Sequence, residues 1–288
     1  MERSVRLTNG TELPAIGQGT WMLGDDPAKR PFELEALRAG IEAGATLIDT
    51  AEMYGDGRSE ELVGEALRHL PKGVARDDIF LVSKVLPANA GRSRIFQSCA
   101  ASLERLGTDY LDLYLLHWRG AVPLAETVAC LEELQGQGAI RAWGVSNFDI
   151  DDMEELWDVP GGRNCQVNQV LYHAGSRGIE FSLLPWMREH GVALMSYCPL
   201  AQAGAIRRGL LEEPVLARIA AAHGIRPVQA LLAWNIRDGR TVAIPRTGSA
   251  SHARENAAAA AVHLTELDLA AMDAAFPPPE WKMPLDME

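Results

Sequence analysis

Basic residues are scarce in this chain of 288 residues, since 27 Lys and Arg stand against 39 Asp and Glu. The resulting net charge is −12 at pH 7. Nucleic-acid binders need clustered cations to neutralise phosphates, so this balance argues against a nucleic-acid partner. A small anionic ligand needs only a local cationic pocket and is not excluded.

Cysteine is also rare, and the four residues form no C-x-x-C pair: Cys99, Cys130, Cys165 and Cys198. Their spread argues against a zinc site and a disulfide framework, and it fits a reducing compartment. No run of about 18 apolar residues occurs, and the first ten residues carry no apolar signal core. We therefore expect a cytoplasmic protein with no membrane partner.

Short apolar runs alternate with longer amphipathic stretches along the chain. Eight runs have the length of buried strands, at residues 15–17, 46–48, 79–82, 111–116, 140–145, 166–170, 192–196 and 241–244. Helical periodicity marks residues 32–43, 59–70, 94–106, 124–135, 150–157, 179–189, 213–222, 228–236 and 266–275. Glycines suited to ending a helix follow several of them: Gly44, Gly107, Gly136, Gly191 and Gly224.

Crossovers of helical length force strands to run parallel, and eight parallel strands close a barrel. We therefore predict an α/β fold, a (β/α)8 TIM barrel. Asn9-Gly10, between alternating residues, predicts a two-residue β-hairpin at the N-terminus that caps the bottom of the barrel. No linker-like segment interrupts the chain, so we expect residues 1–288 to form a single domain.

The alternative architecture is an open doubly wound sheet. Such a sheet usually needs a G-x-G-x-x-G turn after its first strand to hold a pyrophosphate. Gly17-Gln-Gly19 continues instead as Thr20-Trp21-Met22, and no helix begins there. The barrel is the better interpretation.

Active sites of such barrels lie at the C-terminal ends of the strands. The residues around these ends are mostly polar, aromatic or ionisable: Gly19, Thr20, Trp21, Asp49, Lys84, His117, Ser146, Asn147, Gln169, Tyr197, Pro245 and Arg246. One polar residue after a strand is usually an ordinary loop residue. Eight such strand ends on one face indicate a site.

Asp49, Lys84 and His117 follow three consecutive runs, and Tyr54 lies in the loop after Asp49. Neighbouring parallel strands lie roughly 5 Å apart, so the four side chains should meet. Taken singly, Asp49 and Lys84 are typical of a structural ion pair, and His117 of a satisfied core histidine. A carboxylate, an ammonium, an imidazole and a phenol at adjacent strand ends favour a catalytic role instead.

This combination suits carbonyl reduction, because a hydride arriving at a carbonyl carbon leaves negative charge on oxygen. That oxygen must be stabilised and protonated. A free tyrosine has a pKa of about 10, and we expect the neighbouring Lys84 ammonium to lower the pKa of Tyr54. Asp49 would hold Lys84 charged, and His117 would orient the substrate oxygen.

The chain resembles the aldo-keto reductases from the N-terminal hairpin to the last helix. The matching strings are Ile48-Asp49-Thr50-Ala51-x-x-Tyr54-Gly55, Ser83-Lys84, Leu116-His117-Trp118, Gly144-Val145-Ser146-Asn147-Phe148, Ser196-Tyr197-x-Pro199-Leu200 and Ile244-Pro245-Arg246. Two further strings resemble the bacterial members assigned as methylglyoxal reductases: Leu171-Tyr-His-x-Gly-Ser-Arg-Gly-Ile-Glu180 and Ala201-Gln-Ala-Gly204. The resemblance implies an NADP-dependent oxidoreductase that reduces small aldehydes and dicarbonyls such as methylglyoxal, with Tyr54 as the proton donor.

The resemblance also implies NADPH extended across the barrel mouth. Tyr197 would stack on the nicotinamide, and Ser146, Asn147 and Gln169 would bind its carboxamide. Leu200 and Gln202 match the loop over the pyrophosphate. The loop and short helix start after the eighth run form a recurrent phosphate site in barrels. The full set of expected cofactor residues is Gly19, Thr20, Trp21, Asp49, Ser146, Asn147, Gln169, Tyr197, Leu200, Gln202, Ile244, Arg246, Thr247, Gly248, His252, Glu255 and Asn256.

Arg246 and Thr247 match the family's 2′-phosphate positions, and Glu255 and Asn256 match adenine contacts. Taken alone, Arg246 is typical of a solvated surface charge. His252 departs from the pattern, since the better-known mammalian relatives have arginine there. A neutral imidazole would bind the 2′-phosphate less tightly, so we expect NADPH to be preferred and NADH to bind more weakly.

For the substrate, we expect Trp21, Met53 and Trp118 to wall the pocket beside Tyr54 and His117. The loops here are short, which implies few remote contacts and small substrates. Two other functions fit the same fold: a catalytically weak NADPH-binding regulatory barrel, and a dehydrogenase working from alcohol to ketone. A metal-dependent hydrolase is disfavoured because the seven histidines show no H-x-H pair, so no metal is expected. We expect a monomer.

Overall fold

The computed structural model describes residues 3–202 and 204–287, so Ala203 of the family string above lies outside the described residues. Eight parallel strands follow one another in the order β10-β9-β8-β7-β6-β5-β4-β3. Each contains or adjoins one of the eight apolar runs: β3 (Gln18–Gly19), β4 (Leu47–Asp49), β5 (Phe80–Val85), β6 (Leu113–Leu116), β7 (Trp143–Ser146), β8 (Val167–Leu171), β9 (Ala193–Tyr197) and β10 (Thr241–Ala243).

The sheet closes on itself where the first strand meets the last. Parallel bridges join Ile16 to Ala243 and Gly19 to Arg246. The approach is close, since a Cβ on Gly19 would lie 2.8 Å from the Ile244 carbonyl oxygen. Glycine is therefore required at this seam, and the predicted (β/α)8 barrel is confirmed.

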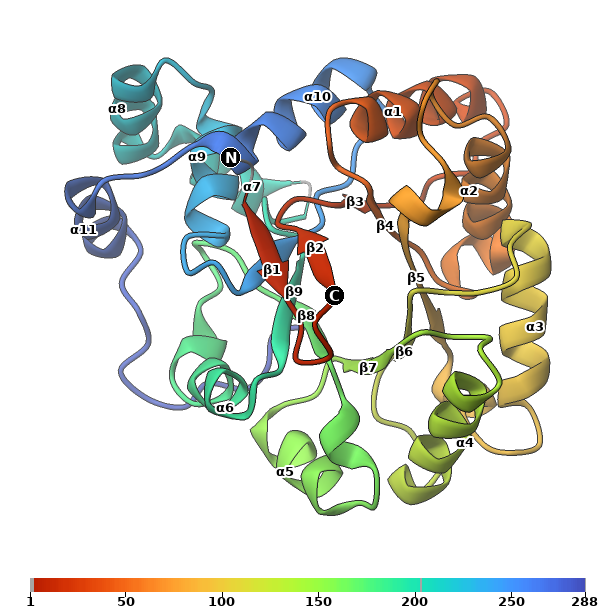
Figure 1. Cartoon of the computed structure of the whole chain (residues 1–288). Coiled ribbons are helices and arrows are strands. Elements are labelled where there is room, and N and C mark those ends of the chain that lie inside the picture. Colours follow the sequence, from red (N-terminus) through yellow and green to blue (C-terminus); the bar gives the residue numbers. More distant parts are fainter. Residues whose placement is uncertain (1–2, 203, 288) are drawn as a thin grey trace.

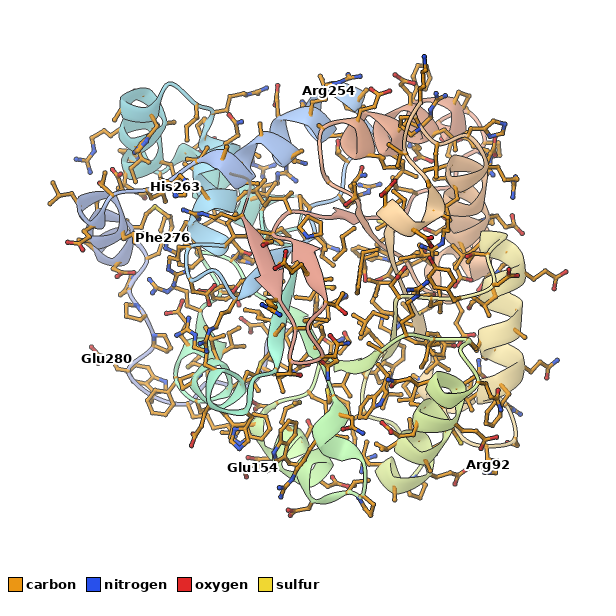
Figure 2. All side chains as sticks on the ribbon, in the orientation of Figure 1. Arg92, Glu154, Arg254, His263, Phe276 and Glu280 are labelled. Atoms are coloured by element: carbon orange, nitrogen blue, oxygen red, sulfur yellow. The ribbon has the colours of Figure 1, made fainter. Side chains whose placement is uncertain are left out.

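Helices surround the ring of strands (Figure 1). They are α1 (Arg30–Glu42), α2 (Arg58–Arg68), α3 (Ile95–Leu106), α4 (Leu124–Gly136), α5 (Ile150–Asp158), α6 (Leu183–His190), α7 (Ala205–Glu212), α8 (Pro214–His223), α9 (Pro227–Asn235), α10 (Ala250–Ala258) and α11 (Glu266–Ala275). Charged side chains such as Arg92, Glu154 and Arg254 lie on the outer surface (Figure 2). Short 3-10 turns span Tyr54–Gly57, Arg76–Asp78, Pro87–Asn89, Gly162–Asn164, Gly178–Glu180 and Ala259–Ala261.

Every stretch with helical periodicity contains a helix, but α7 and α10 have no counterpart among them; α10 corresponds to the short helix expected after the eighth run. The stretch that was to begin at Ile179 starts its helix only at Leu183, because a 3-10 turn precedes it. Gly136 is also wrong as a terminator: it is the last residue of α4, and Gly138 takes the positive φ of 78° instead. The other four predicted glycines do adopt positive φ: Gly44, Gly107, Gly191 and Gly224.

The N-terminal hairpin pairs β1 (Ser4–Arg6) with β2 (Glu12–Pro14) in antiparallel fashion. The predicted two-residue turn is wrong. Leu7 N–H donates to the Thr11 oxygen at 2.8 Å and Gly10 N–H to the Leu7 oxygen at 3.0 Å. These bonds leave a three-residue loop in which Gly10 alone has a positive φ, 89°. Such loops end in one left-handed glycine, so Asn9 does not need that conformation.

This hairpin lies across the N-terminal ends of the strands, in front of the ring in Figure 1. The Thr8 hydroxyl donates to Gln166 Oε1 at 2.7 Å, just before β8 begins. The cap on the bottom of the barrel is therefore present as predicted, and the opposite end remains for a site.

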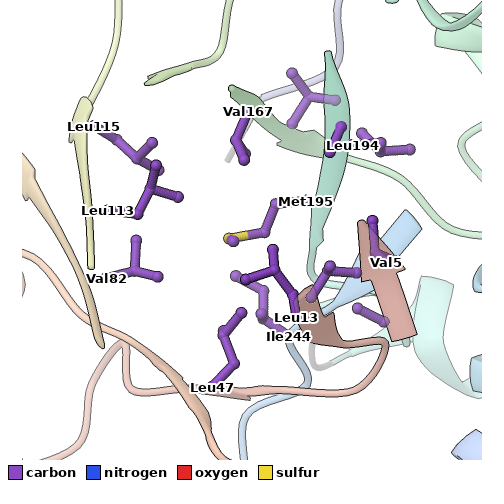
Figure 3. Packing of buried hydrophobic residues seen from close by; sticks show 14 of the residues in the cluster. Val5, Leu13, Leu47, Val82, Leu113, Leu115, Val167, Leu194, Met195 and Ile244 are labelled. Atoms are coloured by element: carbon purple, nitrogen blue, oxygen red, sulfur yellow. The ribbon is translucent and has the colours of Figure 1, made fainter. Parts of the chain in front are cut away.

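Apolar side chains fill the interior of the ring near the hairpin (Figure 3). Leu47, Val82, Leu113 and Met195 are fully buried there, and Leu13 of the hairpin joins them. Side chains alternate along a strand, so the residue two places later also points inward, one layer higher. Asp49 thus follows Leu47, Lys84 follows Val82, and Tyr197 follows Met195. The alternation that builds the core also positions the site.

Candidate active site

A cavity of about 410 Å³ opens among the C-terminal ends of the strands, away from the hairpin. Its walls combine predicted site residues with neighbours from the loops. The lining residues are Gly19, Thr20, Trp21, Met22, Asp49, Met53, Tyr54, His117, Ser146, Asn147, Gln169, Tyr197, Cys198, Pro199, Leu200, Ala201, Gln202, Arg207, Ile244, Pro245 and Arg246.

Lys84 is the centre of the polar cluster beside this cavity. Its Nζ donates to Asp49 Oδ2 at 2.8 Å, to the Thr50 carbonyl oxygen at 2.9 Å and to Tyr54 Oη at 2.9 Å. An ammonium has three N–H donors, so these bonds use all of them and hold the side chain in one direction. Lys84 is fully buried, and Asp49 is 2% exposed. The structure brings these residues together as the sequence predicts.

His117 completes the cluster from the end of β6. Its ring meets the Tyr54 ring edge to face, with centroids 5.7 Å apart, and both residues line the cavity. Within the described part of the chain, His117 Nδ1 is buried without a hydrogen-bond partner. Nε2 is therefore the ring nitrogen left to meet a ligand.

Burial controls the charge states of this cluster. It raises the pKa of Tyr54 well above the ordinary value, and the Asp49 carboxylate adds to the rise. The expected lowering of the Tyr54 pKa is therefore wrong: the cost of burying a phenolate outweighs the help of Lys84, whose charge Asp49 offsets. Burial also lowers the pKa of Lys84, against the opposing effect of Asp49.

The same effect acts on the imidazole. Burial, with a smaller contribution from the Lys84 charge, lowers the pKa of His117 to about 2. At neutral pH the site therefore presents a protonated phenol and a neutral imidazole. His117 acts there as a neutral hydrogen-bonding group.

Several buried groups hold Asp49 in place. Gln169 Nε2 donates to Asp49 Oδ1 at 2.7 Å, so in this structure Gln169 supports the carboxylate. The Thr20 hydroxyl donates to the Asp49 carbonyl oxygen at 2.9 Å, and the Ser59 hydroxyl donates to Thr20 Oγ1 at 2.8 Å. All four side chains are almost completely buried. The end of β4 is thus fixed on both its backbone and its side chain.

The residues expected around a nicotinamide form a second connected group. Tyr197 Oη donates to Asn147 Oδ1 at 2.9 Å, and Asn147 Nδ2 donates to the His117 carbonyl oxygen at 3.1 Å. The Ser146 hydroxyl donates to the Gln169 carbonyl oxygen at 2.9 Å. These bonds place one aromatic face and several amide groups on one wall, next to the polar cluster.

Most of the residues expected to bind the 2′-phosphate and the adenine lie outside the cavity lining. Arg246 lines the cavity, whereas Thr247 and Asn256 line a separate small hollow. His252 is exposed, and Glu255 accepts two bonds from Arg226 Nη1, both at 2.8 Å. Five of the expected cofactor residues do not line the cavity: Thr247, Gly248, His252, Glu255 and Asn256. Their contacts with a cofactor stay predictions.

Of the expected pocket walls, Trp21 and Met53 line the cavity and Trp118 does not. The Trp118 ring lies against His117, with centroids 4.9 Å apart. Successive side chains of an extended segment point in opposite directions, and His117 takes the inward one. Trp118 therefore packs against His117 in this structure, and its contact with a substrate stays a prediction.

Five lining residues were not predicted: Met22, Cys198, Pro199, Ala201 and Arg207. Pro199 belongs to a family string, and Cys198 and Ala201 flank it, so adjacency was the available signal. No pattern marked Arg207, which lies in the unpredicted helix α7.

Backbone strain gathers at the cavity. Among the described residues, five non-glycine residues have positive φ, and four of them line it: Met22, Asn147, Cys198 and Ala201. The fifth, Asp56, lies just after Tyr54. Such conformations are costly and cluster at functional sites, so the strain supports a site here.

The described residues contain no group of three or more His, Cys, Asp or Glu side chains placed to hold a metal ion. No helix formed by residues 3–202 and 204–287 is long and apolar enough to cross a membrane.

A family model and several similar proteins match this chain over most of its length. The model of the Aldo/keto reductase family matches residues 15–276. Methylglyoxal reductase YeaE of Escherichia coli (strain K12) is 53% identical over 286 residues, covering 99% of each chain. Glyoxal reductase of Bacillus subtilis (strain 168) is 34% identical over 274 residues, 95% of this chain and 93% of the relative.

A solved structure matches the fold over its whole length. The aldo/keto reductase from Klebsiella pneumoniae, in complex with NADP and acetate, has a TM-score of 0.95 and 50% sequence identity, covering 100% of both chains. A second structure from the same organism holds NADPH, with the same score and coverage.

Proposed function

The chain belongs to the aldo/keto reductase family, and we propose that it reduces small aldehydes and dicarbonyls such as methylglyoxal to alcohols, with NADPH as the reductant and Tyr54 as the proton donor. The observation that carries this proposal is the Lys84 ammonium bonded to both Asp49 and Tyr54 at the cavity. The names of the Escherichia coli and Bacillus subtilis relatives support the substrate class.

The residues around the cavity suit this cofactor. Tyr197 offers an aromatic face for a planar ring, next to the amide groups of Asn147 and Gln169. Arg246 offers a cation without a carboxylate partner among the described residues. When bound, NADPH supplies the hydride that the carbonyl carbon accepts. The wall of the cavity formed by β7, β8 and β9 would hold the nicotinamide beside the cluster.

The chain's own residues then handle the charge on the carbonyl oxygen. Tyr54 is a protonated phenol at neutral pH, so it can donate its proton to the developing alkoxide. Lys84 donates to Tyr54 Oη and stabilises the phenolate that remains, and Asp49 keeps Lys84 charged and oriented. His117 is neutral and orients the substrate oxygen through Nε2.

The size of the site supports small substrates. The cavity of about 410 Å³ must hold part of the cofactor as well as the aldehyde. Trp21 and Met53 form apolar walls near Tyr54, which suits short or aromatic aldehydes. NADH would bind more weakly because it lacks the 2′-phosphate that Arg246 would contact.

The same observations support the remaining proposals. We propose that the protein is cytoplasmic, consistent with four cysteines that form no disulfide among the described residues. We also propose that it acts as a monomer with one domain.

The alternative function, a catalytically weak regulatory barrel that binds NADPH, requires a damaged cluster. The bonds of Lys84 disfavour it.

The test is a panel of short aldehydes with purified protein and NADPH, followed by the loss of reduced-nicotinamide absorbance. Steady turnover with methylglyoxal and related aldehydes is the expected result. Tight NADPH binding without turnover on any aldehyde would contradict the proposal and favour the regulatory barrel.

A further inference from the structure

Two arginines line the same cavity as Tyr54. Arg246 follows β10, and Arg207 lies in the first turn of α7, in the segment after β9. In the closed ring, β9 stands four strands from β5 in either direction, so it faces the strand that carries Lys84. The segment that carries Arg207 is thus opposite the strand of Lys84, whereas Arg246 follows β10, which is separated from β4 only by β3.

Neither arginine has an acidic partner within residues 3–202 and 204–287. Arg246 makes only a long bond, 3.5 Å, to the Met22 carbonyl oxygen, and Arg207 is half-buried. Twelve of the 23 arginines form ion pairs with carboxylates among the described residues, so the lack of a partner does not by itself set these two apart; what does is that both line the same cavity. Two unpaired cations at one cavity create a local field that attracts an anion.

The two cations lie in different segments of the cavity lining, as the two separate anionic groups of a dinucleotide would require. A continuous lining runs from Tyr197 through Gln202 towards Arg207, whereas Arg246 borders the start of α10. If Tyr197 meets the nicotinamide, the pyrophosphate comes next along the cofactor and the 2′-phosphate lies further away. Arg207 is then placed for the nearer group and Arg246 for the more distant one.

We propose that Arg207 binds the pyrophosphate of the nicotinamide cofactor and therefore strengthens the binding of NADPH and NADH alike, whereas Arg246 reads the 2′-phosphate. This inference rests on the proposed function. Guanidinium groups bind phosphates with paired, charge-assisted hydrogen bonds. The resemblance to the family did not mark Arg207, and the general affinity for both cofactors would depend on it.

The experiment measures dissociation constants by quenching of tryptophan fluorescence, which Trp21 in the cavity makes sensitive. The probes are NADPH, NADH, ADP and 2′-AMP. ADP carries a pyrophosphate and no 2′-phosphate, and 2′-AMP carries the reverse. The variants are Arg207→Ala, Arg246→Ala and Arg208→Ala. Arg208 is the matched control, because it is the next arginine of α7, exposed and outside the cavity lining.

Arg207→Ala is expected to weaken NADPH, NADH and ADP by about tenfold each and to leave 2′-AMP unchanged. Arg246→Ala should weaken NADPH and 2′-AMP only, and Arg208→Ala should change nothing. Arg207→Lys should recover part of the loss, which a merely structural role for the side chain in α7 would not produce.

Three outcomes would overturn the inference. Unchanged affinities in Arg207→Ala remove any cofactor role, and a loss confined to NADPH and 2′-AMP moves Arg207 to the 2′-phosphate. A higher KM for anionic aldehydes with unchanged cofactor affinity assigns it to the substrate. Failure of the proposed function is distinguishable, because it appears as a lack of aldehyde turnover by the unaltered protein, whereas this inference is decided by the dissociation constants of the cofactors in the variants.

Discussion

The two sides of the cavity differ in how their polar groups are satisfied. On the side of β4, β5 and β6, Lys84 donates all three of its N–H groups to protein oxygens. Asp49 accepts hydrogen bonds from Lys84 and Gln169. On the side of β9 and β10, Arg207 and Arg246 have no carboxylate partner among the described residues. Lys84 and Asp49 are thus satisfied by groups of the protein, whereas the two arginines lack a carboxylate partner among the described residues until an anion binds.

We expect one side of the cavity to control the rate of the chemical step and the other to control the affinity for the cofactor. Groups that are fixed before the substrate arrives stabilise charge without reorganising, which accelerates the chemical step. Cations without partners contribute binding energy that is equal before and during that step, which lowers the cofactor's dissociation constant. Substitutions on the two sides should therefore act on different measured quantities.

The largest effect is expected from Tyr54→Phe. The variant keeps the aromatic ring against His117 and loses the proton donor, so kcat for aldehyde reduction should fall by about 10³-fold. The affinity for NADPH should stay within about twofold of the unaltered protein, because Tyr54 is not among the expected cofactor contacts. Steady-state kinetics with methylglyoxal and fluorescence titration measure the two quantities. A large loss of NADPH affinity would break the separation between the two sides.

Lys84→Met should damage both activity and stability. It leaves the Asp49 carboxylate buried without its cation, which costs about 3–5 kcal/mol of the free energy of unfolding. The double variant Asp49→Asn with Lys84→Met removes the stranded charge and should recover much of that loss. Chemical denaturation measures all three proteins. No difference between the single and double variants would show that the pair does not act as a buried unit.

Arg246→Ala tests the other side of the cavity. Its dissociation constant for NADPH should rise by about tenfold, and that for NADH should stay unchanged. With saturating NADPH, kcat should equal that of the unaltered protein. Equal losses for NADPH and NADH would show that Arg246 does not read the 2′-phosphate.

The smallest expected effect is that of pH. Since burial holds the pKa of His117 at about 2, its imidazole stays neutral as pH rises through the physiological range. The raised pKa of Tyr54 keeps the donor protonated up to high pH, and the rate falls only as that proton is lost. The kcat for reduction should therefore change by less than about twofold between about pH 6 and about pH 8. A step near the ordinary pKa of histidine would contradict this.

The reacting side of the site was readable from the sequence because strand periodicity positions it. Asp49 and Lys84 each stand two residues after a core residue of the same strand, so the pattern that identifies the strand also aims the side chain. His117 extends β6 in the same way. The barrel brings these strand ends together without help from long loops.

What the sequence did not reveal depends on tertiary context. Helix α7 contains Gly209 and follows a long connection, so neither its start nor the direction of Arg207 has a local pattern. The direction of the Tyr54 pKa shift depends on how completely the fold excludes water from the phenol. The hairpin loop differs because Thr8 joins the turn, which leaves a positive φ only at Gly10.

The central claim is that Tyr54 sets the rate of reduction while the arginines set cofactor affinity. The most direct measurement is the single-turnover rate of hydride transfer to methylglyoxal, together with NADPH affinity, in Tyr54→Phe, Arg246→Ala and the double variant. The double variant should combine the slow transfer of Tyr54→Phe with the weak NADPH binding of Arg246→Ala, and the two losses should be independent. Hydride transfer in Tyr54→Phe at the rate of the unaltered protein would contradict it.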